Sequence, residues 1–316
     1  MTTILHPTLK IIGADISHHQ GTINWDIMAS KVNFLIIRTG DGIIYGDMKD
    51  RNITINWRQA KLYKIPRGNY MYFRPEVDPK KQAENQIKHL NNDLGEMDTY
   101  GDFENNDKGL SKNQVTDSMN EYLIKADSLT GKLTGLYSSP GFWNANVNHL
   151  NIDKLSLRPK WVARWTFAST PLPLPNGWND WGVWQKSGDG NLRGREFGAL
   201  GSRSIDLNVF NGDAKKFKLL YGVTVAENNI IPSTPPTHVK PKVSMRIRSQ
   251  PNDSFSTPIL GDARPGSIWK IEKLVKDSRQ RDWALINQGV YLAAWLCDLI
   301  YEKDNYTNPE LRLHGR

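Results

Sequence analysis

The chain has 316 residues, 38% of them hydrophobic and 23% charged, which is typical of a soluble globular protein long enough for two domains. Its net charge of +8 would attract any anionic partner, but no zinc-finger spacing, RNP-like aromatic strand or Lys/Arg block favours nucleic acid. A lone cysteine, Cys297, excludes an internal disulfide and cysteine-based chemistry, and no apolar run approaches the roughly 18 residues of a membrane-spanning helix.

Eight short apolar segments rich in β-branched residues follow one another through residues 11–210. They have the lengths of buried strands, and helix-like stretches separate several of them. We therefore predict an α/β fold, an irregular TIM-like (β/α) barrel with eight strands and fewer helices; an open doubly wound sheet is the alternative. The segments are residues 11–17, 33–40, 66–73, 99–105, 132–139, 160–165, 180–187 and 203–210.

Helices are predicted on both sides of the fourth segment. Residues 79–94 carry apolar side chains at spacings of three and four. Residues 111–129 open with Ser111, followed three residues later by Gln114, which is the pattern of a capping box. Between the sixth and seventh segments, the sequence TPLPLPNGWND has too many prolines for a full helix.

The pattern changes after Tyr221. Residues 223–242 contain four prolines and few large apolar side chains, which is typical of an extended linker. Beyond them, short β-like runs alternate with Gly, Pro and Asp turns, as in a small all-β barrel. The predicted domains are therefore a first barrel over 1–222, a linker over 223–242 and a second barrel over 243–316.

Four carboxylates belong to three of the eight segments: Asp15 to the first, Asp102 and Glu104 to the fourth, and Asp206 to the eighth. In a closed parallel barrel, the C-terminal ends of all strands open onto one face, so we expect these acids to converge there. The first and last strands become neighbours on closure, which brings Asp15 and Asp206 together. Both also have structural interpretations: Asp15 accepts backbone N–H groups, and Asp206 anchors a loop or pairs with Arg203.

Asp102 and Glu104 are two residues apart on a predicted strand, so their side chains project from the same face. Two neighbouring acids do not both ionise easily, so one pKa rises and the other falls, which gives a proton donor and a carboxylate in one pocket. Glycoside hydrolysis requires this division of labour. The competing interpretation is a solvated or salt-bridged surface pair.

Aromatic side chains strengthen the sugar interpretation because their faces stack on pyranose rings. Five of the eleven tryptophans lie within residues 161–184, and core packing explains most of them. His18 and His19 are adjacent on an extended chain and point apart, so we predict no metal site and no other cofactor. The residues predicted to line the cleft are Tyr70, Tyr72, Tyr137, Trp165, Gln185 and Arg38, the last contacting substrate or pairing with an acid.

Motifs in these segments form a familiar series. They are DISHHQG at 15–21, WD at 25–26, FLIIRT at 34–39, GNYMYF at 68–73, GDFE at 101–104, WVARW at 161–165, WQ at 184–185 and DLNVF at 206–210. In this order they resemble the glycoside hydrolase family 25 muramidases, the Chalaropsis-type lysozymes, over nearly all of residues 10–212. The resemblance implies a β/α barrel that cleaves the β-1,4 bond between N-acetylmuramic acid and N-acetylglucosamine in peptidoglycan.

The resemblance also implies roles for the acids. Glu104 would be the general acid, and Asp102 would orient the 2-acetamido group of the substrate or stabilise positive charge. Asp15 and Asp206 would tune these two and hold the sugar, by either a covalent or a substrate-assisted route. Two departures from the family pattern, the polar GDFENN context and Arg164 in WVARW, bear on substrate detail and leave the acids in register.

The C-terminal segment carries a second, weaker resemblance. MRIRSQP at 245–251, the Pro265-Gly266 turn, DW at 282–283 and WL at 295–296 resemble a bacterial SH3-like domain. That resemblance implies binding to wall peptide or glycan, with a dimerisation or docking module as the alternative.

The first residues, MTTILHPTLK, lack the basic start, apolar stretch and cleavage site of a secretory signal, so we expect synthesis in the cytoplasm without a signal peptide. Lysins of this kind are characteristic of bacteriophage. We therefore expect a phage or prophage endolysin that reaches the bacterial wall after holin-type release or as part of a phage particle, without membrane insertion. The alternatives are a catalytically silent wall-binding or virion structural protein, and an enzyme acting on another amino-sugar polymer such as chitin.

Overall fold

The computed structural model describes residues 11–42, 48–166, 168–188, 193–226, 238–252, 257–277, 282–287 and 289–300. By its internal contacts the chain divides into two units. The first comprises residues 1–164, 170–188 and 193–231, and the second comprises 165–169, 189–192 and 232–316. None of the helices in the described ranges combines the length and the apolar character needed to cross a membrane.

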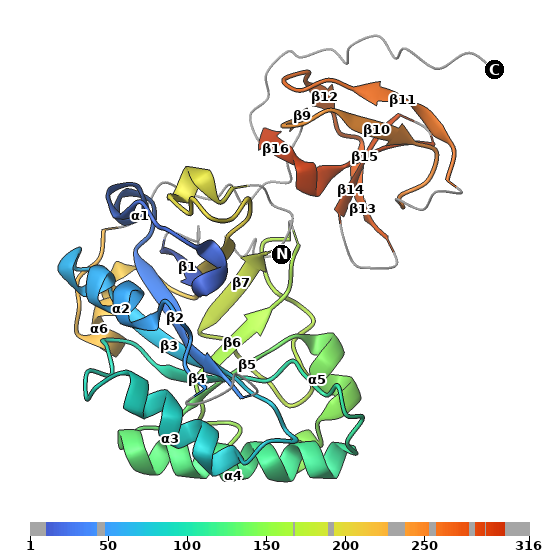
Figure 1. Ribbon diagram of the computed structural model, residues 1–316. Coiled ribbons are helices and arrows are strands. Elements are labelled where there is room, and N and C mark those ends of the chain that lie inside the picture. The colour runs from blue at the N-terminus through green and yellow to red at the C-terminus, as the bar shows by residue number, and fades with distance from the viewer. Residues whose placement is uncertain are drawn as a thin grey trace, which may run out of the picture. The chain divides into compact units, whose positions relative to one another are not determined.

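The first unit is a closed barrel of eight strands arranged in sequence order, with helices on its outside (Figure 1). The predicted barrel with eight strands and fewer helices is therefore confirmed. The strands are β1 (Ile12–Ile16), β2 (Phe34–Asp41), β3 (Arg67–Tyr72), β4 (Thr99–Asp102), β5 (Gly135–Ser138), β6 (Lys160–Ala163), β7 (Val183–Ser187) and β8 (Asp206–Phe210).

The expectation that all strands are parallel is wrong for the last one. β1 to β7 pair in parallel, but β8 is antiparallel to both of its neighbours, β7 and β1. Asp206 is therefore the first residue of its strand, and the reversal of β8 brings this N-terminal end to the rim where the other strands end. An antiparallel return needs no crossover helix, and the described residues between β7 and β8 contain only the 3-10 helix Arg195–Phe197.

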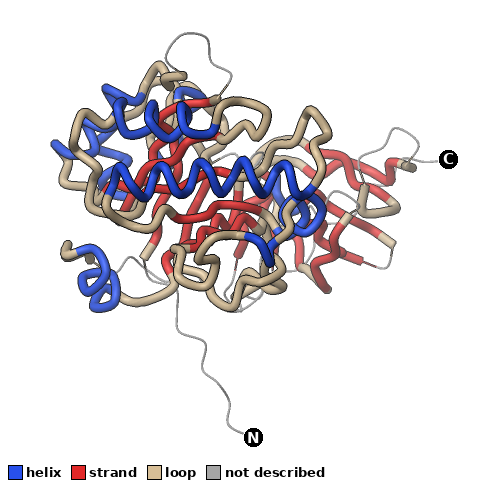
Figure 2. Tube along the Cα trace, turned by 90° about the horizontal axis from the view of Figure 1, so that it is seen from below, coloured by secondary structure: helices blue, strands red, loops and turns tan. Residues whose placement is uncertain are grey.

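Helices pack around the outside of the barrel, and the long α4 runs across the strands in Figure 2. Its start has the predicted capping box, in which Ser111 accepts from the backbone of Gln114, and it ends at Gly131 in the left-handed conformation with φ of 70°. Between β6 and β7 the described residues contain no helix, as the prolines there predicted. The α-helices are α1 (Trp25–Lys31), α2 (Ile53–Leu62), α3 (Pro79–His89), α4 (Lys112–Thr130), α5 (Pro140–Asn146) and α6 (Ala214–Tyr221).

The second unit contains two antiparallel sheets, of strand order β11-β10-β15-β14-β13 and β12-β9-β16. Strand β9 lies inside the segment 223–242 that was predicted to be a linker. Its Val239 is buried and the strand pairs with β16, so these residues belong to the second unit. The SH3-like assignment stays a prediction. The strands are β9 (His238–Pro241), β10 (Met245–Arg248), β11 (Ile259–Ala263), β12 (Trp269–Lys270), β13 (Lys273–Lys276), β14 (Asp282–Asn287), β15 (Val290–Ala293) and β16 (Cys297–Ile300).

Candidate active site

Alternate residues of each strand face the inside of the barrel, because side chains in a strand point to opposite sides in turn. On β1, Ala14 and Ile16 pack outward with residues of α1 and α2, so Asp15 faces inward. The same alternation places a set of polar residues on the inner side, toward the rim where β1 to β7 end. They are Asp15, Arg38, Tyr70, Tyr72, Asp102, Tyr137, Gln185, Asp206 and Asn208.

An aromatic cluster fills the barrel around Trp161. Its ring centroid lies 5.7 Å from that of Tyr70, 5.4 Å from Tyr100 and 4.3 Å from Tyr137. The indole Nε1 donates to Asn208 Oδ1 at 2.7 Å, which connects this cluster to the polar residues. We call this aromatic cluster the floor of the site. Its close packing keeps water from entering between the acids and the core, and it lowers the dielectric around the acids.

Asp15 is buried, with 4% of its surface exposed, and its side chain accepts hydrogen bonds from neutral amides. Gln185 Nε2 donates to its two oxygens at 3.1 and 3.2 Å, and Asn208 Nδ2 donates at 2.6 Å. Burial raises the pKa of Asp15 to about 6, while the bonds from Asn208, Gln185 and Asp206 act in the opposite direction. The predicted neighbours Asp15 and Asp206 are directly paired in the β1–β8 register and share a hydrogen bond.

Asp102 is the last residue of β4 and is 3% exposed. Its Oδ1 is buried and accepts no hydrogen bond from any residue that the structure describes. Burial raises the pKa of Asp102 well above its usual value, and the charges of Glu104 and Asp15 raise it further, while Arg38 acts in the opposite direction. The site therefore contains a carboxyl group that retains its proton more strongly than an ordinary aspartate.

Glu104 lies two residues beyond the end of β4, although the strand was expected to extend through it, and its side chain is exposed. Between Asp102 and Glu104, Phe103 packs outside the barrel beside Phe73 and Tyr122. Glu104 and Asp102 remain close enough for their charges to interact, so the predicted pair exists as one open and one buried carboxyl.

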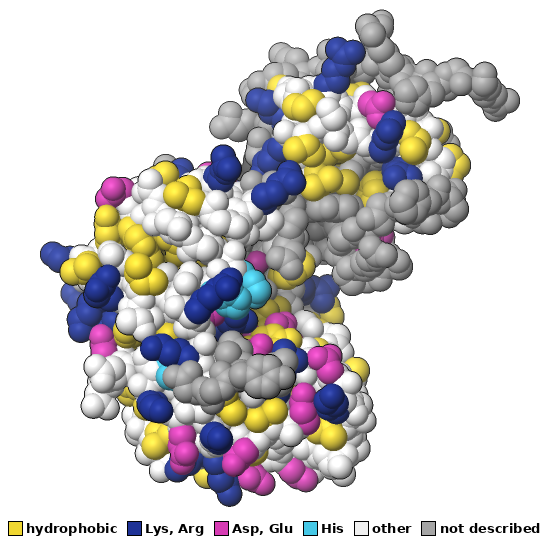
Figure 3. Space-filling model, viewed as in Figure 1, with side chains coloured by type: hydrophobic (Ala, Val, Ile, Leu, Met, Phe, Trp, Pro, Cys, Tyr) yellow, Lys and Arg dark blue, Asp and Glu magenta, His cyan; other side chains and the backbone are white. Residues whose placement is uncertain are grey.

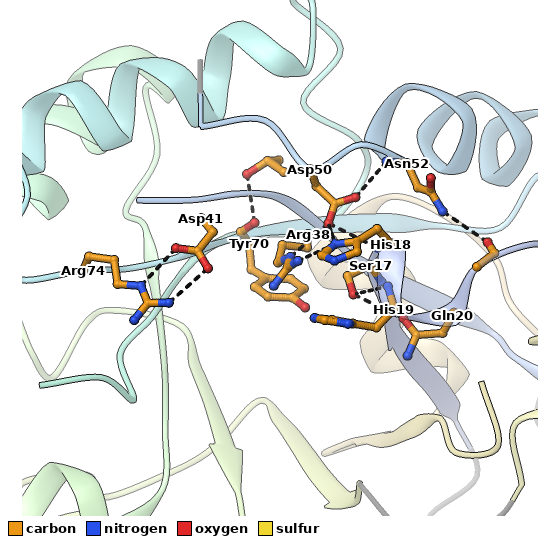
Figure 4. A network of polar contacts seen from close by, with 12 residues as sticks. Ser17, His18, His19, Gln20, Arg38, Asp41, Asp50, Asn52, Tyr70 and Arg74 are labelled. Atoms are coloured by element: carbon orange, nitrogen blue, oxygen red, sulfur yellow. Dashed lines mark hydrogen bonds and ion pairs between the residues drawn. The ribbon is translucent and has the colours of Figure 1, made fainter. Parts of the chain in front are cut away.

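Arg38 forms an ion pair with an acid that the sequence analysis did not single out (Figure 4). Its Nε donates to Asp50 Oδ2 at 3.0 Å, and the same oxygen lies 2.8 Å from His18 Nδ1. Burial acts to raise the pKa of Asp50, but bonds from His18 and the backbone of Asn52, together with the Arg38 charge, hold it below its usual value. Arg38 thus forms an ion pair with an acid, and its contact with substrate stays a prediction.

The predicted tyrosines lie on the strands beside Asp102. Tyr72 is paired with Asp102 in the β3–β4 register, and Arg74 lies 4.6 Å from the centroid of its ring. Tyr137 pairs with Asp102 from β5, and its hydroxyl donates to Gln185 Oε1 at 2.9 Å. Tyr70 lies two residues before Tyr72, where it is buried against Trp161. Contact of the three tyrosines with substrate stays a prediction.

Trp165 is the predicted cleft residue that the barrel does not include. It follows β6 beyond Arg164, is 44% exposed, and belongs to the second unit. Its contact with substrate therefore stays a prediction.

Three residues of the site were missed as functional: Asp50, Asn208 and the floor residue Trp161. Asn208 had a signal, since it lies two residues after Asp206 and so faces the same side of the strand. Core packing, the role predicted for most of the tryptophans in 161–184, is incomplete for Trp161, because its Nε1 donates to Asn208 Oδ1. No local pattern marks Asp50, whose partners come from β2 and from the short helix His18–Gln20.

The arrangement suits acid-assisted cleavage of a polar bond. Asp102 and Glu104 form a pair of one buried and one open carboxyl that retains a proton, and hydroxyl and amide groups that can orient a sugar surround it. Among the residues that the structure describes, no three His, Cys, Asp or Glu side chains are placed to hold a metal ion.

Comparison with known proteins places this barrel among related sequences. The model of "Glycosyl hydrolases family 25" matches residues 14–195. Lysozyme M1 of Streptomyces globisporus is 28% identical over 223 residues, which are 67% of this chain and 72% of that protein.

Solved structures agree with the sequence comparison. The bacterial lysozyme from Streptomyces coelicolor has a TM-score of 0.54 and 27% identity, over 67% of this chain and 97% of that one. The spore cortex lytic enzyme SleM of Clostridium perfringens has a TM-score of 0.56 over 90% of this chain and 95% of that one, but at 18% identity it supports the fold alone.

Proposed function

Since the chain belongs to glycosyl hydrolases family 25, whose model matches more than half of it, we propose that it is a muramidase cleaving the β-1,4 bond between N-acetylmuramic acid and N-acetylglucosamine in peptidoglycan. The observation that carries the proposal is the meeting of Asp15, Asp102, Glu104 and Asp206 at one rim of the barrel, with Asp102 Oδ1 buried and accepting no hydrogen bond from a described residue.

In this proposal Glu104 protonates the leaving glycosidic oxygen. Because two neighbouring carboxylates do not both ionise easily, the Asp102–Glu104 pair retains a proton that an acid catalyst needs. Glu104 is open to solvent in the free protein, and a bound sugar would exclude that water from the pair. The open position of Glu104 thus suits a group that must reach the substrate, while substrate binding prepares it for proton transfer.

The remaining acids act from below the sugar. Asp102, between Tyr72 and Tyr137, orients the 2-acetamido group or stabilises the positive charge of the transition state. Asp15 shares a hydrogen bond with Asp206, and its charge adds to the raised pKa of Asp102. Covalent and substrate-assisted routes both use these positions.

We propose further that the second unit is an SH3-like module that binds wall peptide or glycan. Such binding would raise the local concentration of the barrel on an insoluble substrate without changing the chemical step. The role that we propose for the whole chain is that of a phage or prophage endolysin, which is synthesised in the cytoplasm and acts on the bacterial wall.

The test is digestion of purified sacculi followed by mass spectrometry of the released fragments. Fragments with muramic acid at the reducing end are expected, and reducing-end glucosamine would contradict the assigned bond. Release of soluble product from chitin and none from sacculi would favour the other amino-sugar polymer. Wall binding without any release would favour the catalytically silent alternative.

The same assay tests the acid. Glu104→Gln keeps the shape of the side chain and removes its proton, so release should fall by roughly 10²- to 10⁴-fold. Glu121→Gln is the matched control, because Glu121 is an exposed residue of α4 that forms an ion pair with Lys80. Undiminished release by the Glu104→Gln variant would remove the acid assignment.

A further inference from the structure

A cavity of about 520 Å³ lies beside α2 and the C-terminal end of α3, and none of the four acids lines it. One wall is a face of α2 that carries Thr54, Arg58 and Lys61 at helical spacing, and the other carries Lys88 and Asn91. Arg67, at the base, begins β3 five residues before Tyr72, which corresponds to roughly 16 Å along the strand from the catalytic rim. We call this cavity the α2–α3 groove.

The α2–α3 groove has an excess of positive charge. Lys49, Arg58, Lys61, Arg67 and Lys88 line it, whereas Asp93 is the one carboxylate among its lining residues. Arg67 and Lys61 are paired with that carboxylate at 2.9 and 3.0 Å. Neither Arg58 nor Lys88 forms an ion pair with any residue that the structure describes. In Figure 3, Lys and Arg side chains gather over α2 at the left edge of the molecule.

Helix electrostatics alone do not account for these cations. Lys61 and Lys88 lie in the last turns of α2 and α3, where a positive charge offsets the helix dipole. Arg58 lies before the last turn of α2 and forms no ion pair with a described residue, yet it lines the same groove as Lys88. These two side chains are therefore available to a ligand that carries negative charge.

We propose that the α2–α3 groove binds a phosphodiester group of an anionic wall polymer. Arginine and lysine donors on opposite walls suit a tetrahedral anion whose oxygens point to both sides, and Thr54 and Asn91 add neutral donors. A polymer with bases is disfavoured, because the indole of Trp57 is 7% exposed and the Arg67 guanidinium lies 4.6 Å from its centroid. It therefore offers no free face for stacking.

This inference goes beyond the cleavage reaction, and a binding assay tests it without catalysis. The probe is soluble poly(glycerol phosphate), titrated into the full chain by calorimetry. Arg58→Ala/Lys88→Ala should weaken binding about tenfold and make it less dependent on salt, because charge-assisted contacts and released counterions are lost. The control is Lys215→Ala/Lys218→Ala, which removes the same charge from exposed positions of α6 and should change binding by less than about twofold.

Several outcomes would overturn the proposal. Equal weakening by the two double variants would indicate attraction to net charge alone. Equally tight binding of poly-γ-glutamate, with the same response to Arg58→Ala/Lys88→Ala, would indicate a carboxylate polymer, and tighter binding of single-stranded DNA would indicate nucleic acid. Cleavage of sacculi stripped of anionic polymer should be unchanged in the Arg58→Ala/Lys88→Ala variant, so a failure of groove binding and a failure of the proposed muramidase activity are distinguishable.

Discussion

Partly exposed carboxylates near the start of β3 and a buried carboxyl at the end of β4 differ in their partners. At the end where β3 begins, Arg67 pairs with Asp93 at 2.9 Å and with Glu96 at 2.8 Å, and the bonds from Arg67 hold the pKa of Asp93 down to about 2. At the end where β4 stops, Asp102 accepts no hydrogen bond at Oδ1 from any described residue, and burial raises its pKa.

The same contrast holds for a second pair of positions. Arg158, just before β6, donates to Asp127 and Asp153 at 2.9 and 3.0 Å. Asp15, on β1, accepts from the neutral amides of Gln185 and Asn208, and its pKa rises to about 6. In the arginine pairs, a buried guanidinium neutralises partly exposed carboxylates. A buried acid left with neutral partners is instead costly to the fold and available for proton chemistry.

The largest expected effect is the loss of stability when Arg67 is replaced. Arg67→Met leaves Asp93 and Glu96 without their buried partner, so the free energy of unfolding should fall by roughly 3–5 kcal/mol. Lys61→Met removes an exposed partner of the same Asp93 and should cost less than about 1 kcal/mol. Urea denaturation measures both. Equal losses in the two variants would mean that burial of the cation is not what distinguishes this end.

Asp102→Asn should have the converse effect. Removing the charge that develops beneath the sugar should lower kcat by about 10²- to 10³-fold, or about 3–4 kcal/mol of activation free energy, without loss of stability. Asp127→Asn is the matched control, because it weakens the Arg158 pairing and should lower stability while leaving kcat unchanged. If Asp102→Asn instead destabilised the fold with full activity, Asp102 would be a structural acid.

The sequence predicted which acids meet at the rim where β1 to β7 end. It did not predict the arginine pairs at the opposite end of the barrel. Barrel closure was enough to bring Asp15 beside Asp206, because the first and last strands of a closed sheet must pair. It did not reveal that β8 is reversed, since an apolar strand has the same alternation in either direction. Hydrogen-bond partners such as Asp50 for Arg38 come from loops whose paths no local pattern specifies.

The difference between Asp15 and Asp93 can be measured through the pH dependence of stability. The folded pKa of Asp15, about 6, lies above the usual 3.8, so the native state binds more protons between these values and stability falls as pH rises from about 4 to 6. The advantage of Asp15→Asn over the wild type should therefore increase from pH 4 to pH 7, by at most about 3 kcal/mol. Asp93→Asn should behave oppositely, with a loss of stability at pH 7 that shrinks as pH falls toward 2. A pH-independent difference for Asp15→Asn would contradict the raised pKa.

Tyr137→Phe should give the smallest effect. It tests whether the Tyr137 hydroxyl orients the Gln185 amide toward Asp15. Burial raises the pKa of Tyr137 well above its usual value, so its hydroxyl stays protonated and donates to Gln185 Oε1, which fixes the amide with Nε2 toward Asp15. Without that donor the amide is free to turn its oxygen toward the carboxylate, and kcat should fall by about 3- to 10-fold with a stability loss of about 1 kcal/mol.

Tyr221→Phe separates positioning from packing. Its hydroxyl donates to Asp98 at 3.0 Å near the start of β4, so the same atom is lost at the opposite end of the barrel. A similar loss of stability with unchanged kcat is expected there. If both variants left kcat unchanged, the Tyr137 hydroxyl would not be what orients the Gln185 amide toward Asp15.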